Sequence, residues 1–185
     1  MVRPVREQLE HDRVIRQLQA RYRRRYEVVI NPAAEQNMAV GPPNAPIYPD
    51  LVVMSSERGR KLQAVVEVET PESVNNLEAL AQWVSMGRLR VAFHLYIPAG
   101  SVDVARRLYT DLQVPVAELW SYHAIGDQIR FTLVYRAPAE VRAPRPRVAA
   151  AVPRRKSADR AAAKPSQRSR PKKTASKPTR TQKRR

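Results

Sequence analysis

The stretch that decides the fold is YPDLVVMSSERGRKLQAVVEVET, residues 48–70. Two runs rich in apolar and β-branched residues, 51–54 and 62–69, flank a polar segment centred on Arg58-Gly59. Such runs predict β-strands, and a glycine-containing segment between them predicts a hairpin turn. We therefore expect two antiparallel strands, with Pro49-Asp50 directly before the first.

The predicted hairpin gathers three carboxylates at one end. Side chains alternate between the two faces of a strand, so Glu67 and Glu69 point to the same face, about 7 Å apart. Antiparallel pairing places Asp50 opposite the end of the second strand, near both glutamates. Gathered like charges destabilise a fold unless a cation neutralises them, and Mg²⁺ prefers oxygen ligands. The pattern predicts a metal site; the alternative is that alternating Glu marks an ordinary solvent-exposed face.

The sequence before the hairpin predicts a helix and a further strand. Residues 1–25 carry apolar side chains at mostly helical spacing and are rich in arginine, which predicts a basic amphipathic helix packed on the core. The β-branched run 26–30 predicts a strand, and the proline-rich segment 31–49 predicts a loop.

The sequence after the hairpin predicts alternating helices and strands. Thr70-Pro71 has the pattern of an N-cap and first-turn proline, so we expect a helix from there to Gly87. Its expected inward stripe consists of Val74, Leu77, Leu80, Ala81 and Val84. A strand at 91–97, a helix from Ser101 and strands at 114–122 and 128–135 follow. The fold class expected for residues 26–136 is α/β, with a central mixed β-sheet flanked by helices.

This order of elements resembles the PD-(D/E)xK nuclease core found in restriction-endonuclease-like and DNA-repair nucleases. The resemblance covers residues 26–97. Pro49-Asp50 matches the PD element, Glu67 the acidic position, and Glu69 the position of the motif lysine. The resemblance implies that Asp50 and Glu67 hold Mg²⁺ or Mn²⁺ and that Glu69 is a further ligand or water-orienting base. Some restriction enzymes of this fold also use Glu-x-Glu in place of the lysine.

A strongly basic tail follows the predicted domain. The formal net charge is +17, and residues 137–185 hold 17 of the 34 lysines and arginines but only Glu140 and Asp159 as acids. This segment has no aromatic residue, so we expect it to be disordered and to bind nucleic acid, chiefly duplex DNA backbone, through phosphate contacts. The candidate contacts are Lys164, Arg168, Arg170, Lys172, Lys173, Lys177, Arg180, Lys183, Arg184 and Arg185. Secondary candidates are Arg21, Arg23, Arg24 and Arg25.

Several classes of protein are excluded or disfavoured. The chain has no cysteine, which excludes disulfides and thiolate metal sites, and no membrane span or signal peptide is evident. We expect a cytoplasmic protein, nucleoid-associated if bacterial, with a homodimer as one alternative because many nucleases of this fold are dimers. Two functions remain open: a metal-dependent endonuclease that hydrolyses phosphodiesters, and a catalytically inactive nucleic-acid-binding scaffold of the same fold.

Overall fold

The computed structural model describes residues 4–138, except 34, 58 and 127. These residues all lie in the first of two units into which the chain divides, Met1–Arg147. The predicted disordered tail, residues 137–185, falls outside the described residues apart from Ala137 and Pro138. Within the described ranges, none of the helices is both long and apolar enough to span a membrane.

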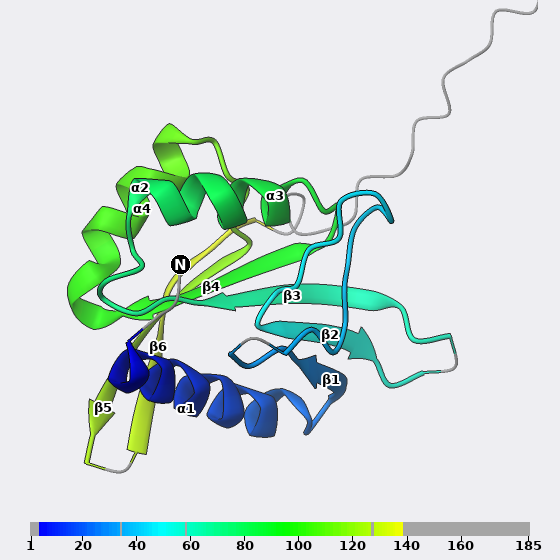
Figure 1. The fold of residues 1–185 in the computed structure, drawn as a ribbon, viewed down its shortest axis with the longest axis horizontal. Helices are drawn as coiled ribbons and strands as arrows, with labels where there is room; N and C mark the ends of the chain where they lie inside the picture. Colours follow the sequence, from blue (N-terminus) through cyan, green and yellow to red (C-terminus); the bar gives the residue numbers. More distant parts are fainter. Residues whose placement is uncertain (1–3, 34, 58, 127, 139–185) are drawn as a thin grey trace, which may run out of the picture. The chain divides into compact units, whose positions relative to one another are not determined.

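A six-stranded mixed sheet forms the centre of the domain. The strands lie in chain order: β1 (Tyr26–Ile30), β2 (Leu51–Ser55), β3 (Leu62–Val68), β4 (Ala92–Pro98), β5 (Glu118–Ile125) and β6 (Gln128–Arg136). β3, β4 and β5 run parallel to one another, whereas β1–β2, β2–β3 and β5–β6 are antiparallel pairs. The predicted α/β class with a central mixed sheet flanked by helices is confirmed (Figure 1).

The helix α1 (Val5–Tyr22) covers one face of the sheet (Figure 1). Its buried residues, His11, Val14, Ile15 and Leu18, recur at intervals of three and four, which places them on one side of the helix. They pack against side chains of β2, β3 and β4 such as Val53, Val66 and Tyr96. The predicted N-terminal helix packed on the core is therefore present.

A broken helical segment covers the other face. It consists of α2 (Asn76–Glu78), the π-helical turn η1 (Ala79–Trp83) and α3 (Val84–Gly87). The predicted N-cap at Thr70 is wrong, because the Asn75 side chain accepts the hydrogen bonds from the N–H groups of Leu77 and Glu78. Thr70 lies in the turn between β3 and this segment, where its N–H donates to Ser73 Oγ at 2.8 Å.

The buried face of this segment also differs from the predicted stripe. Leu77 and Leu80 are 68% and 48% exposed, whereas Ala79, Trp83 and Met86 are buried. The prediction assumed regular α-helical spacing from Thr70. The helix starts later, and in η1 the N–H of Val84 bonds to the carbonyl of Ala79, five residues back, which rotates the following residues.

The second half of the domain completes the sheet and its cover. The short 3₁₀ turn η2 (Ala99–Ser101) leads into α4 (Val102–Asp111), which buries Ala105 on the same side as α3. The strand predicted at 114–122 begins only at Glu118. Val114 and Val116 are buried but lie before the first residue of β5. They belong to the segment between α4 and β5, which packs against the end of α3. A Cβ added at Gly87 would lie 2.8 Å from Pro115 Cδ.

The buried side of α1 provides a matched test of this packing. We expect Leu18→Ala to lower the free energy of unfolding by about 2–5 kcal/mol, because Leu18 is fully buried. The same substitution at Leu9, which is 66% exposed on the same helix, should change it by less than about 0.5 kcal/mol. Urea unfolding of the full protein measures both. Equal effects would mean that α1 does not dock as described.

Candidate functional site

Asp50 and Glu67 are brought together by the pairing of β2 with β3. Leu51 lies opposite Val66 in the antiparallel register, so Asp50, one residue earlier, meets Glu67, one residue later. The backbone N–H of Asp50 donates to Glu67 Oε2 at 3.2 Å. Both side chains are largely shielded from solvent, with exposed fractions of 8% and 4%. The predicted proximity of these two acids is present in the structure.

The Asp50 carboxylate is held by two donors. Its Oδ2 accepts a 2.8 Å hydrogen bond from the N–H of Val68 on β3 and lies 3.2 Å from Nε2 of His11 on α1. His11 Nε2 also lies 3.0 Å from the carbonyl oxygen of Val68. A carbonyl oxygen can only accept, so Nε2 carries the proton in this arrangement. The contacts orient Asp50 from both the sheet and the helix.

His11 was missed as a site residue in the sequence analysis. It has no metal-ligand spacing to another histidine, and its partner Asp50 is 39 residues away along the chain. One signal was available, since His11 lies three and four residues before Val14 and Ile15 on the buried side of α1. A histidine on the apolar face of a helix requires a polar partner from the rest of the fold.

Glu69 occupies a different environment from the acid pair. It is fully buried, and its Oε1 accepts a 2.6 Å hydrogen bond from Nε1 of Trp83 on η1. Its carbonyl oxygen accepts a 2.7 Å bond from the hydroxyl of Tyr122 on β5. In residues 4–138, leaving aside 34, 58 and 127, no group of three or more His, Asp or Glu side chains could hold a metal ion. Of the predicted meeting of three carboxylates, the structure shows the contact of the Asp50 N–H with the Glu67 carboxylate.

The start of α1 is fastened to the end of β3 beside the acid pair. Thr70 is fully buried, and its hydroxyl donates to Glu7 Oε1 at 2.5 Å. Glu7 lies one helical turn before His11. The hydrogen bond from Thr70 to Glu7 and the contact of His11 with the Val68 carbonyl hold the first turns of α1 against the end of β3.

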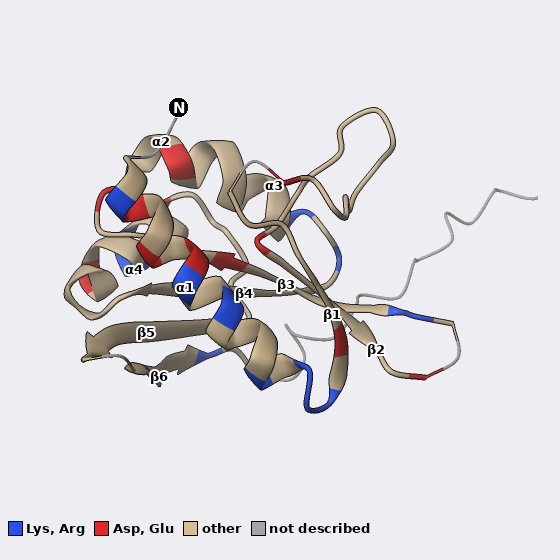
Figure 2. Ribbon diagram, turned by 60° about the horizontal axis from the view of Figure 1, so that its bottom comes forward, with Lys and Arg blue, Asp and Glu red and all other residues tan. Residues whose placement is uncertain are grey.

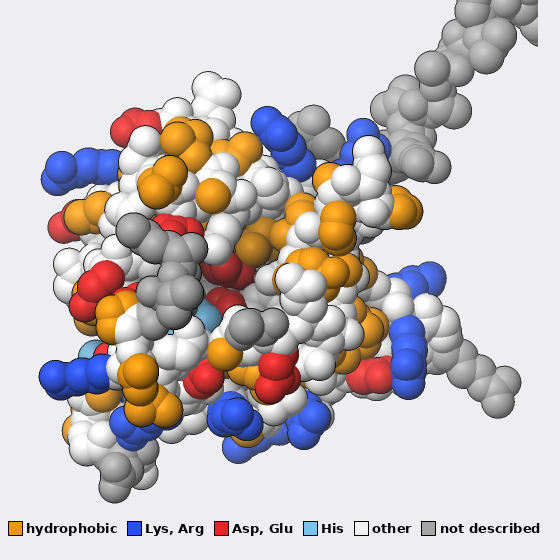
Figure 3. All heavy atoms as spheres, viewed as in Figure 1, with side chains coloured by type: hydrophobic (Ala, Val, Ile, Leu, Met, Phe, Trp, Pro, Cys, Tyr) orange, Lys and Arg blue, Asp and Glu red, His pale blue; other side chains and the backbone are white. Residues whose placement is uncertain are grey.

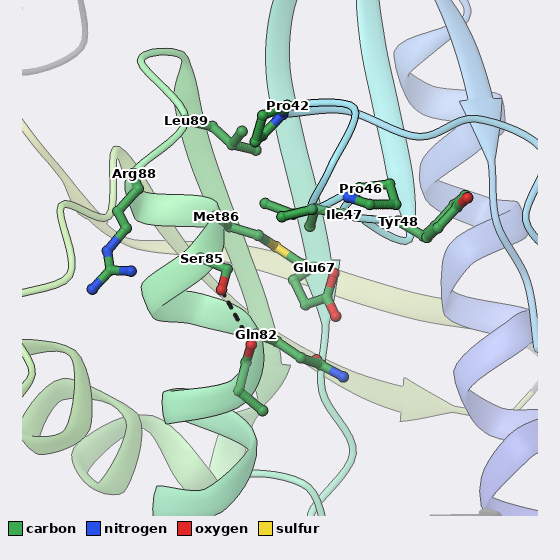
Figure 4. A pocket seen from close by; sticks show the side chains of 12 residues that line it. Pro42, Pro46, Ile47, Tyr48, Glu67, Gln82, Ser85, Met86, Arg88 and Leu89 are labelled. Atoms are coloured by element: carbon green, nitrogen blue, oxygen red, sulfur yellow. Dashed lines mark hydrogen bonds between the residues drawn. The ribbon is translucent and has the colours of Figure 1, made fainter.

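Glu67 borders a cavity of 640 Å³ between the helical segment and the loop that precedes β2. The loop contributes Pro42, Pro46, Ile47 and Tyr48, η1 and α3 contribute Gln82, Ser85 and Met86, and the turn after α3 contributes Arg88 and Leu89 (Figure 4). Figure 3 shows acidic side chains and a histidine within a recess near the middle of one face of the domain. A ligand in this cavity would therefore lie beside a carboxylate of the acid pair.

A second polar cluster lies on the α1 face of the sheet. The Tyr22 hydroxyl lies 2.8 Å from Nδ1 of His94 and 3.1 Å from the hydroxyl of Tyr96. Glu118 accepts hydrogen bonds from Trp120 Nε1 and Arg136 Nε, each at 2.9 Å. His94 is thus a hydrogen-bonded histidine of a central strand.

The secondary candidates border this cluster. Tyr22, His94 and Glu118 line a depression of 410 Å³ together with Arg21, Arg24 and Arg25. Arg21 lies over the ring of Trp120, 4.6 Å from its centroid, in cation–π geometry. Arg23, Arg24 and Arg25 are exposed, and Figure 2 shows cationic residues where α1 leads into β1. This surface is positively charged.

Comparison of the chain with protein-family models, with characterised proteins and with solved structures finds no match.

The buried tyrosines make the stability of the domain sensitive to alkaline pH. Burial raises the pKa of Tyr96 to about 12 and raises that of Tyr22 as well. An unfolded chain loses these protons near pH 10, at roughly the ordinary tyrosine pKa, while the folded protein keeps them. Their contribution to stability is therefore complete below about pH 10 and is lost as the pH rises toward about 12.

We expect the free energy of unfolding of the full protein, measured in urea, to fall between about pH 10 and 12. The fall should be smaller in Tyr96→Phe, which has no proton to lose at this position. Tyrosinate absorbance should show the same residue titrating late in the folded protein. An unchanged alkaline profile in Tyr96→Phe would contradict the burial of this hydroxyl.

Proposed function

We propose that the protein is a metal-dependent nuclease of the PD-(D/E)xK type, which hydrolyses phosphodiester bonds of nucleic acid. The observation that carries this proposal is the Asp50–Glu67 pair, joined by a 3.2 Å hydrogen bond from the Asp50 N–H to Glu67 Oε2. These are the residues that match the two acids of the family motif. Asp50 directly precedes β2, and Glu67 lies near the end of β3, where it borders a cavity large enough for a substrate.

The arrangement of the elements supports a restriction-endonuclease-like fold. A helix precedes three antiparallel strands, β1, β2 and β3, and a helical segment then leads to β4, which is parallel to β3. This is the order that the resemblance implies, with Asp50 directly before the second strand of the core and Glu67 on the third. Fold alone does not define activity, so the acid pair carries the functional argument.

The residues present fit a divalent cation of the magnesium type. Protein-bound Mg²⁺ is often held by one or two carboxylates, with water and substrate phosphate completing its shell. Asp50 and Glu67 provide such a pair, and the hydrogen bonds to the Asp50 side chain from Val68 and His11 both involve Oδ2. Mg²⁺ or Mn²⁺ at such a site supplies polarisation of the phosphodiester and a lower pKa of bound water.

The protein's own residues orient this pair. The N–H of Val68 and the ring of His11 direct the Asp50 carboxylate, and the N–H of Asp50 directs the Glu67 carboxylate. Glu69, predicted as a further ligand or water-orienting base, is fully buried and bonded to Trp83. We propose that Glu69 instead positions β3 against the helical segment, so that Glu67 borders the cavity.

One observation favours the catalytically inactive scaffold as a second candidate. Lys61 is the only lysine before residue 139, and it lies directly before β3, whereas Glu67 lies near the other end of this strand. A nuclease of this type would have to orient its attacking water without a motif lysine. The scaffold alternative keeps the fold and nucleic-acid binding but lacks turnover.

Plasmid nicking in Mg²⁺ or Mn²⁺ decides between these candidates. We expect the full protein to nick supercoiled DNA, and Glu67→Gln and Asp50→Asn to lower the rate about 100-fold or more, because each removes one charge that would hold the cation. Glu72→Gln is the matched control, since it makes the same change at an exposed position just after β3. Metal-independent nicking, or equal rates in all variants, would exclude the proposed site. Binding without nicking by the unaltered protein would establish the scaffold.

We further propose that the basic tail binds nucleic-acid backbone without regard to sequence. All ten candidate residues, from Lys164 to Arg185, lie outside the described residues, so the support comes from composition. The segment holds 17 cationic and two acidic residues among its 49, and each cation that neutralises a phosphate releases a condensed counterion. The exposed Arg23, Arg24 and Arg25 provide a smaller cationic surface on the domain.

The salt dependence of DNA binding tests the role of the tail. We expect a chain that ends at Arg147, the last residue of the first unit, to bind duplex DNA more weakly than the full chain and with a shallower slope of log K against log salt. The slope should decrease by roughly 0.9 for each phosphate that the tail neutralises in the full chain. Circular dichroism checks that the shorter chain is folded. Identical slopes for the two folded chains would refute tail binding.

A further inference from the structure

The cavity beside Glu67 is larger than phosphodiester hydrolysis requires. A scissile phosphate and a hydrated cation would need space only next to the acid pair, whereas the cavity measures 640 Å³ and extends along α3. Cavities of about 300–1,000 Å³ hold organic ligands such as cofactors and drug-sized molecules. The remaining space is therefore available to another part of the substrate.

The walls of this cavity are suited to a flat apolar ring. On one side stands the loop that ends in the isolated bridge between Val40 and Ile47, with the pyrrolidine rings of Pro42 and Pro46. On the other side α3 presents Met86 and, just beyond it, Leu89 (Figure 4). A planar ring inserted between loop and helix would cover apolar surface on both of its faces.

Gln82 provides a polar group inside this apolar space. It extends from η1 toward β3, beside Glu67 (Figure 4). Its Oε1 is buried and has no hydrogen-bond partner among the residues that the structure describes. Buried polar atoms are almost always paired in folded proteins, so an unpaired one at a cavity requires an explanation. A primary amide offers both a donor and an acceptor, whichever way round it is placed.

Gln82 lies within the π-helical turn η1. η1 places Trp83, which bonds to the buried Glu69, directly after Gln82, which lines the cavity. Two adjacent helical residues thus meet two glutamates of the same strand, Glu67 and Glu69. Single π-helical turns within α-helices occur frequently at functional sites.

We propose that this cavity binds an unpaired nucleobase, whose neighbouring backbone phosphate lies at Asp50 and Glu67, and that Gln82 hydrogen-bonds the edge of that base. The proposal rests on the proposed nuclease function and specifies its substrate class. A base within an intact duplex cannot enter such a cavity, so the substrate is single-stranded or locally unpaired nucleic acid. Side-chain amides are suited to base edges because they match paired donor and acceptor atoms.

Neutral deoxynucleosides test the cavity separately from the cationic tail and from catalysis. Calorimetric titration of the full protein with each of the four deoxynucleosides should show binding of at least one. We expect Gln82→Ala to weaken that binding about tenfold, since it leaves the polar edge of the base without its partner. Ala45→Trp, on the exposed loop side of the cavity, should weaken it at least as much by filling the space.

Gln63→Ala is the matched control, since it removes the same amide from an exposed position on β3 and should leave binding unchanged. No binding by the unaltered protein would overturn the proposal, and so would Gln82→Ala and Ala45→Trp variants that bind as tightly as the unaltered protein. The plasmid assay distinguishes failure of the proposed base site from failure of the proposed nuclease function. Nicking without nucleoside binding refutes the base site alone, and nucleoside binding without nicking refutes the nuclease function and retains the base site.

Discussion

The antiparallel register of β2 and β3 is the constraint on which the candidate site depends. Leu51 pairs with Val66, and this register alone brings the Asp50 N–H to Glu67 and the Asp50 carboxylate to the N–H of Val68. A shift of one residue would turn every side chain of β3 to the opposite face of the sheet, which would move Glu67 and Glu69 to the α1 side. Because both faces of β3 are buried, such a shift would be strongly unfavourable.

Burial of several carboxylates is costly, and the structure offsets this cost with donors from every neighbouring element. β3 and α1 provide donors to Asp50, the backbone N–H of Asp50 provides one to Glu67, and η1 provides one to Glu69. Apolar residues at these positions would need no such donors. The retention of carboxyl groups in the interior, next to a cavity, is the physical argument for a binding or catalytic role.

The two faces of the sheet differ in chemistry. On the side of α3, the cavity combines apolar walls with Glu67 and Gln82. On the side of α1, arginines border a depression whose interior holds a chain of hydrogen-bonded aromatic side chains, including Tyr22 and Tyr96. In the proposed function the first surface receives an unpaired base and its phosphate, and the cationic regions attract the nucleic-acid backbone.

The sequence by itself determined the helix α1, the strands apart from the start of β5, the hairpin and the proximity of Asp50 to Glu67, because strand periodicity and turn residues are local features. Only the tertiary structure decided the phase change in η1 and the pairing of His11 with Asp50 and of Trp83 with Glu69. These depend on contacts between residues 14 to 39 positions apart and on a π-helical turn, for which local periodicity carries no signal.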